Sequence, residues 1–304
     1  MVGATVLIVT TRPLTYALIT PARNEAENLR RLAGCLLEQT VEPTAWMVVD
    51  DGSTDETAEV ARELEETRDW IRSLAAPSRG GSLIDGRRAG RDIVAFNAGM
   101  AALSRIPDIV IKLDADVSMA PDYFELLVSE FAADPQLGMA SGACYELERG
   151  IWVQRHVTRS HVRGATRAYR RACLEDVLPL EERLGWDGID QIKANLRGWK
   201  TKSFTSLGFR HHRSMGQRDG MRRAWASQGD VAHFLGYRFS YLVLRTLHHA
   251  RKDPAAVAML WGYLRRVLRR EPLYHDSAVR AYLRREQSFR KLMHRVPEAL
   301  GRRA

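Results

Sequence analysis

Hydrophobic and polar positions follow two different periods along the first 210 residues. Short, nearly continuous hydrophobic runs, typical of buried strands, occur at Tyr16–Thr20, Trp46–Val49 and Ile109–Leu113. Two later runs, Gly138–Leu147 and Gly164–Arg170, also read as strands. Between the runs, hydrophobic residues recur three and four positions apart, as on amphipathic helices. This alternation predicts an α/β sheet flanked by helices.

Helix boundaries are marked by local signals. Asn24 with Glu27 reads as a capping box, and Pro121 stands where the first turn of a helix should begin. Gly198 reads as the end of another helix. The helices predicted after the first one are Thr54–Thr67, Arg91–Leu103, Asp122–Phe131 and Asp187–Leu196.

The pattern changes after residue 215, where only helices are predicted. They cover Ala232–His248, Pro254–Arg270 and a last segment capped by Asp276 that runs to about Arg295. Aromatic residues, leucines and arginines are mixed as in helices that lie on a membrane surface. The alternative is that at least one of these helices packs its hydrophobic stripe on the body, and both can hold together.

Composition excludes several classes of protein. The chain has 304 residues, of which 45% are hydrophobic and 27% charged, which is typical of globular proteins rather than disordered or fibrous ones. Three cysteines without CxxC spacing argue against a disulfide framework or a structural zinc site and favour a reducing compartment. The uncharged segment 254–264 is too short to span a bilayer, so we expect a cytoplasmic protein.

Charge is distributed unevenly. Residues 1–200 carry 24 basic and 30 acidic side chains, whereas residues 201–304 carry 22 basic and 7 acidic ones. The second part, with a net charge of +15, suits a polyanionic partner such as nucleic acid or the anionic lipids of a cytoplasmic leaflet. A solvated basic face is the alternative.

Acidic residues follow three successive predicted strands. The first strand is followed by Glu25, the second by Asp50 and Asp51, and the third by Asp114 and Asp116. In an open α/β sheet the carboxyl ends of such strands line the ligand site. Carboxylates gathered there repel one another unless a cation lies among them, and hard oxygen ligands select Mg²⁺, Mn²⁺ or Ca²⁺, of which we expect Mg²⁺ or Mn²⁺. Such a cation favours a substrate that carries phosphates.

Four segments in this order resemble the nucleotide-binding half of family 2 glycosyltransferases. They are YALITPARNEAENLRRLAGCLLEQT, VVDDGSTDET, GRDIVAFNAGM and IVIKLDADVSMAPDYFE, and they lie within residues 14–145. The resemblance implies the glycosyltransferase A fold in a catalytic domain of residues 1–215, followed by a basic helical region of residues 216–304. It also implies a nucleotide-sugar donor.

The resemblance also implies where the nucleoside binds. Asp51 should accept a hydrogen bond from the base, which requires an N–H group such as that of uracil. The residues after the first strand that should line the nucleoside pocket are Pro21, Ala22, Arg23 and Glu25.

The diphosphate and the sugar should lie beside the next elements. Arg91 stands where the family keeps a basic group near the diphosphate, with Arg87 and Arg88 as alternatives. Asp114 should face the ribose or the donor sugar, and Asp116 should bind the metal. The metal would neutralise charge as the nucleoside diphosphate leaves.

The family's catalytic base stands at the start of a later helix. Counting back from Gly198 gives Asp187, although this chain has Trp186 before it where the family has Glu. Asp190, one turn later, is the alternative base, and a capping role for Asp187 is the structural alternative. His211 follows the next strand and is a candidate metal ligand, with Arg210 and Arg213 beside it as arguments against a nearby cation.

These observations predict an inverting, metal-dependent glycosyltransferase that uses a UDP-sugar. The acceptor would be a lipid-linked or growing glycan in envelope or exopolysaccharide synthesis, reached by a protein bound peripherally to the inner face of the plasma membrane. A nucleotidyltransferase is one alternative, but ARNEAEN stands where a glycine-rich phosphate loop would be needed. A basic nucleic-acid-binding protein is another, but the basic region contains no stacking platform or recognition helix, so no nucleic-acid partner is expected.

Overall fold

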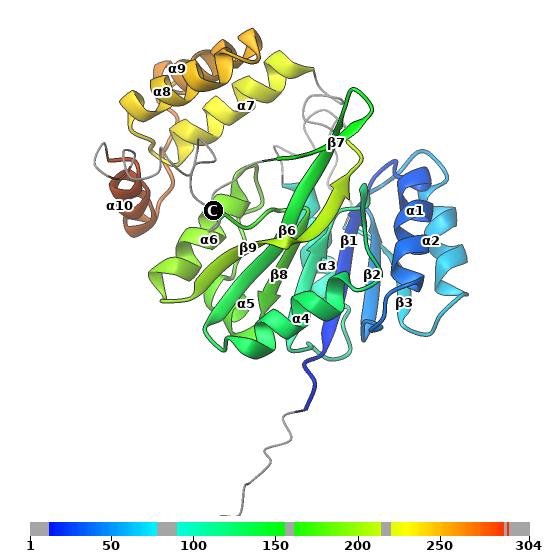
Figure 1. Cartoon of the computed structure of the whole chain (residues 1–304). Helices are drawn as coiled ribbons and strands as arrows, with labels where there is room; N and C mark the ends of the chain where they lie inside the picture. Colours follow the sequence, from blue (N-terminus) through cyan, green and yellow to red (C-terminus); the bar gives the residue numbers. More distant parts are fainter. Residues whose placement is uncertain (1–11, 78–89, 156–160, 214–219, 289–290, 292–304) are drawn as a thin grey trace, which may run out of the picture.

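The computed structural model describes residues 12–77, 90–155, 161–213, 220–288 and 291. Within these residues, nine strands form one mixed sheet with helices on both faces (Figure 1). The strand order is β3-β2-β1-β4-β8-β6-β9-β5, and β7 pairs with β6. The strands are β1 (Tyr16–Ala22), β2 (Ala45–Asp50), β3 (Ile71–Ala75), β4 (Ile109–Leu113), β5 (Val117–Met119), β6 (Leu137–Glu148), β7 (Ile151–Gln154), β8 (Thr166–Arg170) and β9 (Lys200–His211).

The first half of the sheet is parallel. Strands β3, β2, β1 and β4 run in one direction, and Leu18 lies between Trp46 on β2 and Ile111 on β4. Both faces of β1, β2 and β4 are covered, which explains their continuous hydrophobic sequences, whereas the outer strand β3 is partly exposed. Because parallel strands end at one edge of a sheet, the polar residues that follow β1, β2 and β4 meet there.

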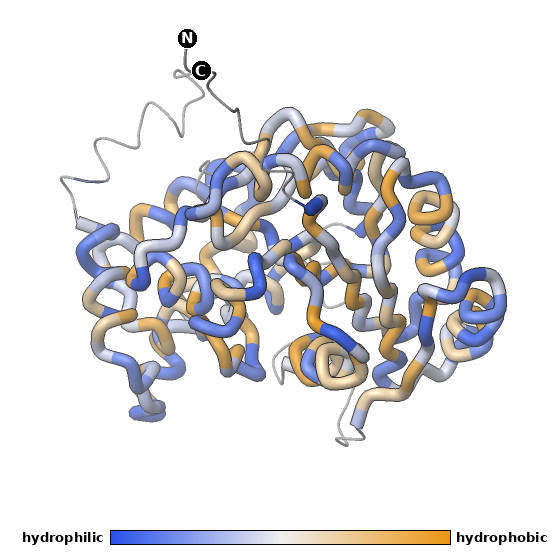
Figure 2. Tube along the Cα trace, turned by 90° about the horizontal axis from the view of Figure 1, so that it is seen from below, coloured by the Kyte–Doolittle hydropathy of each residue, from blue (hydrophilic) through white to orange (hydrophobic). Residues whose placement is uncertain are grey.

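Helices cover the two faces of the sheet in separate sets. Leu29, Val60 and Phe124 pack on one face, whereas Phe96, Leu174 and Trp186 pack on the other. Hydrophobic and hydrophilic residues alternate along these outer helices (Figure 2), as expected for helices with one buried side. The first set is α1 (Ala26–Leu37), α2 (Thr57–Glu65) and α4 (Tyr123–Ala133); the second is α3 (Arg91–Ala101), α5 (Arg171–Val177) and α6 (Trp186–Leu196).

The second half of the sheet changes direction and brings distant residues together. Strand β8 is antiparallel to β4, and the short β5 pairs antiparallel with the end of β9. In that pairing Val117 lies opposite His211, and the amide of His212 donates to the carbonyl of Asp116 at 2.8 Å. The acidic turn after β4 is therefore fixed beside the end of β9.

The last helices form a layer that rests on α6. Tyr274 and Val279 pack with Ile189 and Ile192 of α6, so one helix of this region does pack on the body. In the part of the chain that the structure describes, no helix has the length and hydrophobicity needed to cross a bilayer. The helices are α7 (Met221–Phe234), α8 (Phe239–Ala250), the 3₁₀ turn η2 (Pro254–Val257), α9 (Ala258–Leu268) and α10 (Ser277–Glu286).

Two glycines let α7 and α9 cross with their backbones in contact. A Cβ on Gly229 would lie 2.0 Å from the carbonyl oxygen of Met259, and one on Gly262 would lie 2.0 Å from that of Ala226. No larger residue fits either position without separating the two helices.

Two local predictions are wrong. Asn24 does not cap α1: its backbone has φ of 53°, and its side-chain oxygen accepts from the amide of Thr54 at 2.8 Å. This bond joins the ends of β1 and β2 instead of starting a helix. The helix expected over Ala232–His248 is broken, because Gly236 has φ of 68° and separates α7 from α8.

Candidate active site

Asp51 lies at the end of β2, where arginines from two other elements surround it. Its carboxylate accepts from Nε and Nη2 of Arg91 at 2.7 and 2.8 Å, and Nη1 of Arg23 lies 3.7 Å away. Its backbone amide donates to the carbonyl of Ala22 at 2.8 Å, which joins the residue to the end of β1. The structure thus brings together Ala22, Arg23, Asp51 and Arg91, which sequence analysis had assigned to the donor, with Arg91 bound to Asp51.

Asp114, Asp116 and His211 converge into a set that can hold a metal ion. One ligand atom from each lies within 4.8 Å of the others. Nε2 of His211 is 3.2 Å from Oδ1 of Asp116, and both side chains are largely buried. Two carboxylates and an imidazole are suitable ligands for Mn²⁺ or Mg²⁺, so the residues fit the predicted metal.

His211 sits in an electrostatically negative environment. Burial lowers the pKa of His211, but hydrogen bonds with Asp116 and Cys144 and the charges of Asp116 and Asp114 together raise it to about 10. Cys144, Glu146 and His211 form a second group with ligand atoms within 4.8 Å of one another. His211 thus belongs to both groups of possible metal ligands.

A buried lysine connects the metal set with α6. Nζ of Lys112, on β4, is 2.6 Å from Asp114 and 3.5 Å from Asp92, and it lies 5.3 Å from the centre of the Trp186 ring. The indole N–H of Trp186 donates to Asp92 at 3.2 Å. Asp92 follows Arg91 at the start of α3, so one chain of contacts runs from Asp51 through α3 to the first residue of α6.

Asp187 is the second residue of α6 and does not cap it. The N-cap is Gly185, with φ of 94°, and no side chain makes a capping bond there. In the described part of the chain, no hydrogen bond or ion pair holds the half-buried Asp187 carboxylate. The nearby His161 has a pKa lowered to about 4, chiefly by burial, although Asp187 acts in the opposite direction. The oxygens of Asp187 are therefore available to accept a proton.

Asp190 has the opposite environment, one turn further along α6. Its carboxylate accepts from Arg167 at 2.9 Å, from the hydroxyl of Tyr169 at 2.5 Å and from the amide of Gln191 at 2.5 Å. Asp190 is 2% exposed, and burial raises its pKa to about 6, although Arg167 and Tyr169 oppose that shift. Its lone pairs are thus already used in hydrogen bonds from two side chains of β8 and from one backbone amide of α6.

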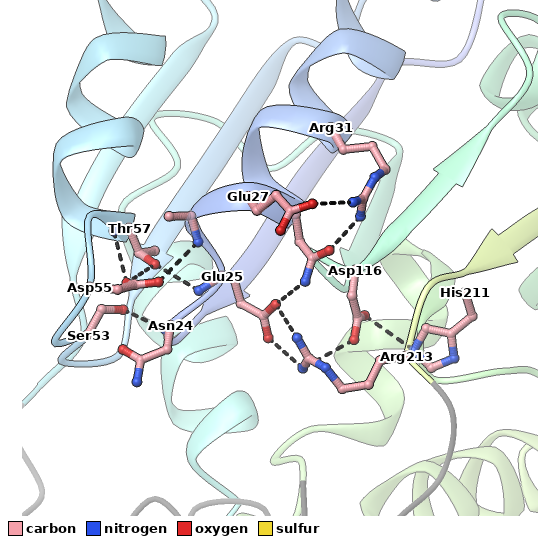
Figure 3. Close-up of polar contacts among 12 residues, drawn as sticks. Asn24, Glu25, Glu27, Arg31, Ser53, Asp55, Thr57, Asp116, His211 and Arg213 are labelled. Carbon is pink, nitrogen blue, oxygen red and sulfur yellow. Dashed lines mark hydrogen bonds and ion pairs between the residues drawn. The ribbon is translucent and has the colours of Figure 1, made fainter. Parts of the chain in front are cut away.

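Sequence analysis missed two arginines at this site. Arg213 donates to both oxygens of Glu25, at 2.7 and 2.5 Å, and its Nη1 is 3.3 Å from Asp116 (Figure 3). Arg167 is fully buried and donates to the backbone carbonyl of Asp187 at 2.5 Å. Arg213 was visible only as a charge beside His211, and Arg167 had no signal, because an arginine inside a strand gives no indication of its partners.

Not every predicted residue can be placed. Arg87 and Arg88 lie outside the described residues. Pro21 is the penultimate residue of β1 and pairs with Val49 of β2, next to Ala22. The other predicted site residues lie on the connected elements described above.

Comparison with known sequences identifies a family match over most of the chain. The profile of Glycosyl transferase family 2 matches residues 17–244. A 4,4'-diaponeurosporenoate glycosyltransferase of Staphylococcus haemolyticus is 29% identical over 128 residues, which are 42% of this chain and 31% of that protein. A poly-beta-1,6-N-acetyl-D-glucosamine synthase of Staphylococcus aureus is 29% identical over 119 residues, which are 39% of this chain and 26% of that protein. The matched region is thus about a third or less of these relatives' length.

A solved structure has a similar arrangement of helices and strands. The mannosyltransferase PcManGT from Pyrobaculum calidifontis, in complex with GDP-Man and Mn²⁺, superposes with a TM-score of 0.57 at 17% identity, covering 96% of this chain and 84% of that one. Similarity at this level of identity concerns the fold. It confirms the expected α/β architecture as a glycosyltransferase A fold.

Proposed function

The chain belongs to glycosyl transferase family 2 and is a glycosyltransferase; on that premise we propose that it transfers a sugar from a UDP-sugar, with inversion and with the help of a divalent metal. The observation that carries this proposal is the meeting of Asp114, Asp116 and His211 at the edge where β1, β2 and β4 end. Ligand atoms from separate segments meet there beside a carboxylate, Asp51, that suits a uracil N–H.

Each residue of the proposed donor site has a defined task. Pro21, Ala22, Arg23 and Glu25 line the nucleoside pocket, and Asp51 accepts from the base. Arg91, now paired with Asp51, lies close enough to the end of β2 to share its guanidinium with a diphosphate. Bound by Asp114, Asp116 and His211, Mg²⁺ or Mn²⁺ would neutralise the charge of the leaving diphosphate.

We assign the proton transfer to Asp187. The carboxylate takes the proton of the acceptor hydroxyl while that oxygen forms a bond to the anomeric carbon of the sugar. The bond between that carbon and the diphosphate oxygen breaks at the same time, and the nucleoside diphosphate leaves. We favour Asp187 over Asp190 as the base because Asp190 is buried and already accepts three hydrogen bonds.

We further propose that the acceptor is a lipid-linked or growing glycan at an anionic membrane surface. The segment 238–270, which contains α8, η2 and α9 and is called the helical hairpin below, has eight basic residues and one acidic residue. Its exposed hydrophobic side chains include Leu247, Trp261 and Leu268, of which Trp261 is 61% and Leu268 77% exposed. Exposed hydrophobic residues among arginines are typical of helices that lie on anionic lipid. In this proposal, residues 216–304 are a membrane-binding region attached to the catalytic domain.

The donor proposal is tested by thermal stabilisation with a panel of nucleoside diphosphates and nucleotide-sugars, with and without Mn²⁺. A ligand present at 100 times its Kd should stabilise the folded protein by about 2.7 kcal/mol. We expect the largest shift with a uridine nucleotide in the presence of Mn²⁺. Equal shifts for every nucleotide, or shifts that do not depend on Mn²⁺, would contradict the assigned donor or metal respectively. The matched control is Asp116→Asn, which should lose the dependence on Mn²⁺.

A further inference from the structure

Arg213, just after β9, contacts two parts of the site that follow different strands. Its guanidinium forms a two-pronged ion pair with Glu25 after β1 and touches Asp116 after β4 (Figure 3). Both carboxylates are less than one-tenth exposed, so the charges interact with little screening by solvent. Arg213 thus neutralises part of the negative charge that the metal would otherwise neutralise.

The two contacts of Arg213 differ in strength. Glu25 is held by both prongs and also accepts from Nδ2 of Asn28 at 2.6 Å, and Asn28 in turn accepts from Arg31 at 2.5 Å. The contact between Arg213 and Asp116 is longer, with 3.3 Å between Nη1 and Oδ2. The contact with Asp116 is therefore the one that can be exchanged while the contact with Glu25 stays in place.

A divalent ion bound by Asp114, Asp116 and His211 would lie next to this guanidinium. Two cations so close repel each other, and the guanidinium competes for the same carboxylate. A donor diphosphate changes this balance, because its oxygens can accept from the guanidinium fork while they share the metal. A bound diphosphate should therefore strengthen metal binding, and a bound metal should strengthen diphosphate binding.

We propose that Arg213 couples metal binding to donor binding by holding Asp116 until the diphosphate of the donor accepts that contact. The inference rests on the proposed metal and donor sites and adds to them a reason for ordered binding. Coupling between two ligands is reciprocal, so the nucleotide must strengthen metal binding by the same factor as the metal strengthens nucleotide binding.

The test measures Mn²⁺ affinity from the electron paramagnetic resonance signal of free Mn²⁺, with and without UDP. In the unmodified protein we expect UDP to tighten Mn²⁺ binding by about 5–150-fold. Arg213→Gln removes the competing charge, so Mn²⁺ alone should bind roughly tenfold more tightly and the enhancement by UDP should shrink. Arg213→Lys retains the charge and should bind Mn²⁺ alone as weakly as the unmodified protein.

Arg31→Gln is the matched control. It removes one positive charge from the far end of the same hydrogen-bonded chain but has no contact with Asp116, so its Mn²⁺ affinity should be unchanged. If Arg213→Gln binds Mn²⁺ alone no more tightly than the unmodified protein, or Arg213→Lys binds it more tightly, the coupling role is refuted while the donor site stands. If the unmodified protein binds no Mn²⁺ even with UDP or GDP, the metal-dependent function fails, and the coupling fails with it.

Discussion

The carboxylates at the two ends of the candidate site have opposite environments. At the donor end, Glu25, Asp51 and Asp116 each lie against an arginine that comes from another element. At the start of α6, Asp187 has no such partner within the described residues, although the buried pair of Arg167 and Asp190 lies one turn away.

In the proposed function, this difference separates ligand binding from proton transfer. A carboxylate held by a guanidinium has a fixed position, which suits recognition of a ligand. A carboxylate without such a partner can accept a proton, provided that its backbone is held. Arg167 supplies that support by binding the carbonyl of Asp187 and the side chain of Asp190 together.

The largest expected effect comes from removing the proposed base, Asp187. Asp187→Asn should lower kcat by about 10²–10⁴-fold, because general-base help contributes that much. UDP affinity, measured by calorimetry, should change little, because Asp187 lies on α6 and not among the donor residues. The control is Asp122→Asn, which changes another aspartate beside a helix start that makes no capping bond. If kcat is unchanged in Asp187→Asn, the division between the two ends is wrong.

The contacts that hold the backbone of Asp187 can be removed separately, by replacing Arg167. Arg167→Met leaves Asp190 buried without its cation and should lower the free energy of unfolding by about 3–5 kcal/mol. Arg31→Met removes a partly exposed pair with Glu27 and should cost only about 0–1 kcal/mol. Chemical denaturation measures both values. Equal losses in the two variants would show that the buried pair does not hold this end together.

A smaller effect is expected at the helical hairpin, above α6. Replacing both Trp261 and Leu268 by Ser should weaken binding to anionic vesicles by about tenfold or more, since burying such a side chain contributes roughly 1.5–3 kcal/mol. Stability should change little, by about 0.5 kcal/mol, because both side chains are exposed. Flotation with anionic vesicles measures this binding, and Ile151→Ser, at a similarly exposed residue of β7, is the control. Unchanged flotation of the double variant, or an equal loss with Ile151→Ser, would contradict the proposal that the helical hairpin is the docking surface.

The smallest expected effect is the response of the helical region to acid. His249 packs against Trp225, and burial, helped by Arg245, lowers its pKa to about 4. The unfolded chain takes up a proton near pH 6.5 and the folded one only near 4, so stability should fall as the pH drops through that interval. His249→Gln should reduce the loss of Tm between pH 7 and 4.5. His248→Gln, at an exposed neighbour, should retain the full loss.

The sequence was sufficient to predict three of the four parallel strands, whereas the partly exposed β3 was not predicted. Buried parallel strands are continuous hydrophobic runs, so β1, β2 and β4 were visible, and the acidic residues after them follow from the geometry of such sheets. Strand β5 has three residues and no pattern of its own. Its pairing with β9, which places Asp116 beside His211, depends on contacts between distant segments.

The partners of charged residues were harder to predict than their positions. Arg91 was expected near the diphosphate, but nothing in the sequence indicated that it would bind Asp51. Arg213 was taken as evidence against a cation, whereas in the structure it lies 3.3 Å from Asp116, the predicted metal ligand. An ion pair between residues 188 positions apart is decided by tertiary packing, for which neither periodicity nor spacing gives a signal.

The glycine crossing of α7 and α9 has a mechanical consequence. With no side chains between the two backbones, α9 cannot be displaced without carrying α7, and a Cβ at Gly185 would meet the side chain of Val231 on α7 at 2.7 Å. Helix α7 therefore packs on α9 through backbone contacts and, through Val231, on the turn immediately ahead of Asp187. The helical hairpin, which we propose binds anionic lipid, is thus joined through α7 to the turn immediately ahead of Asp187, the proposed base.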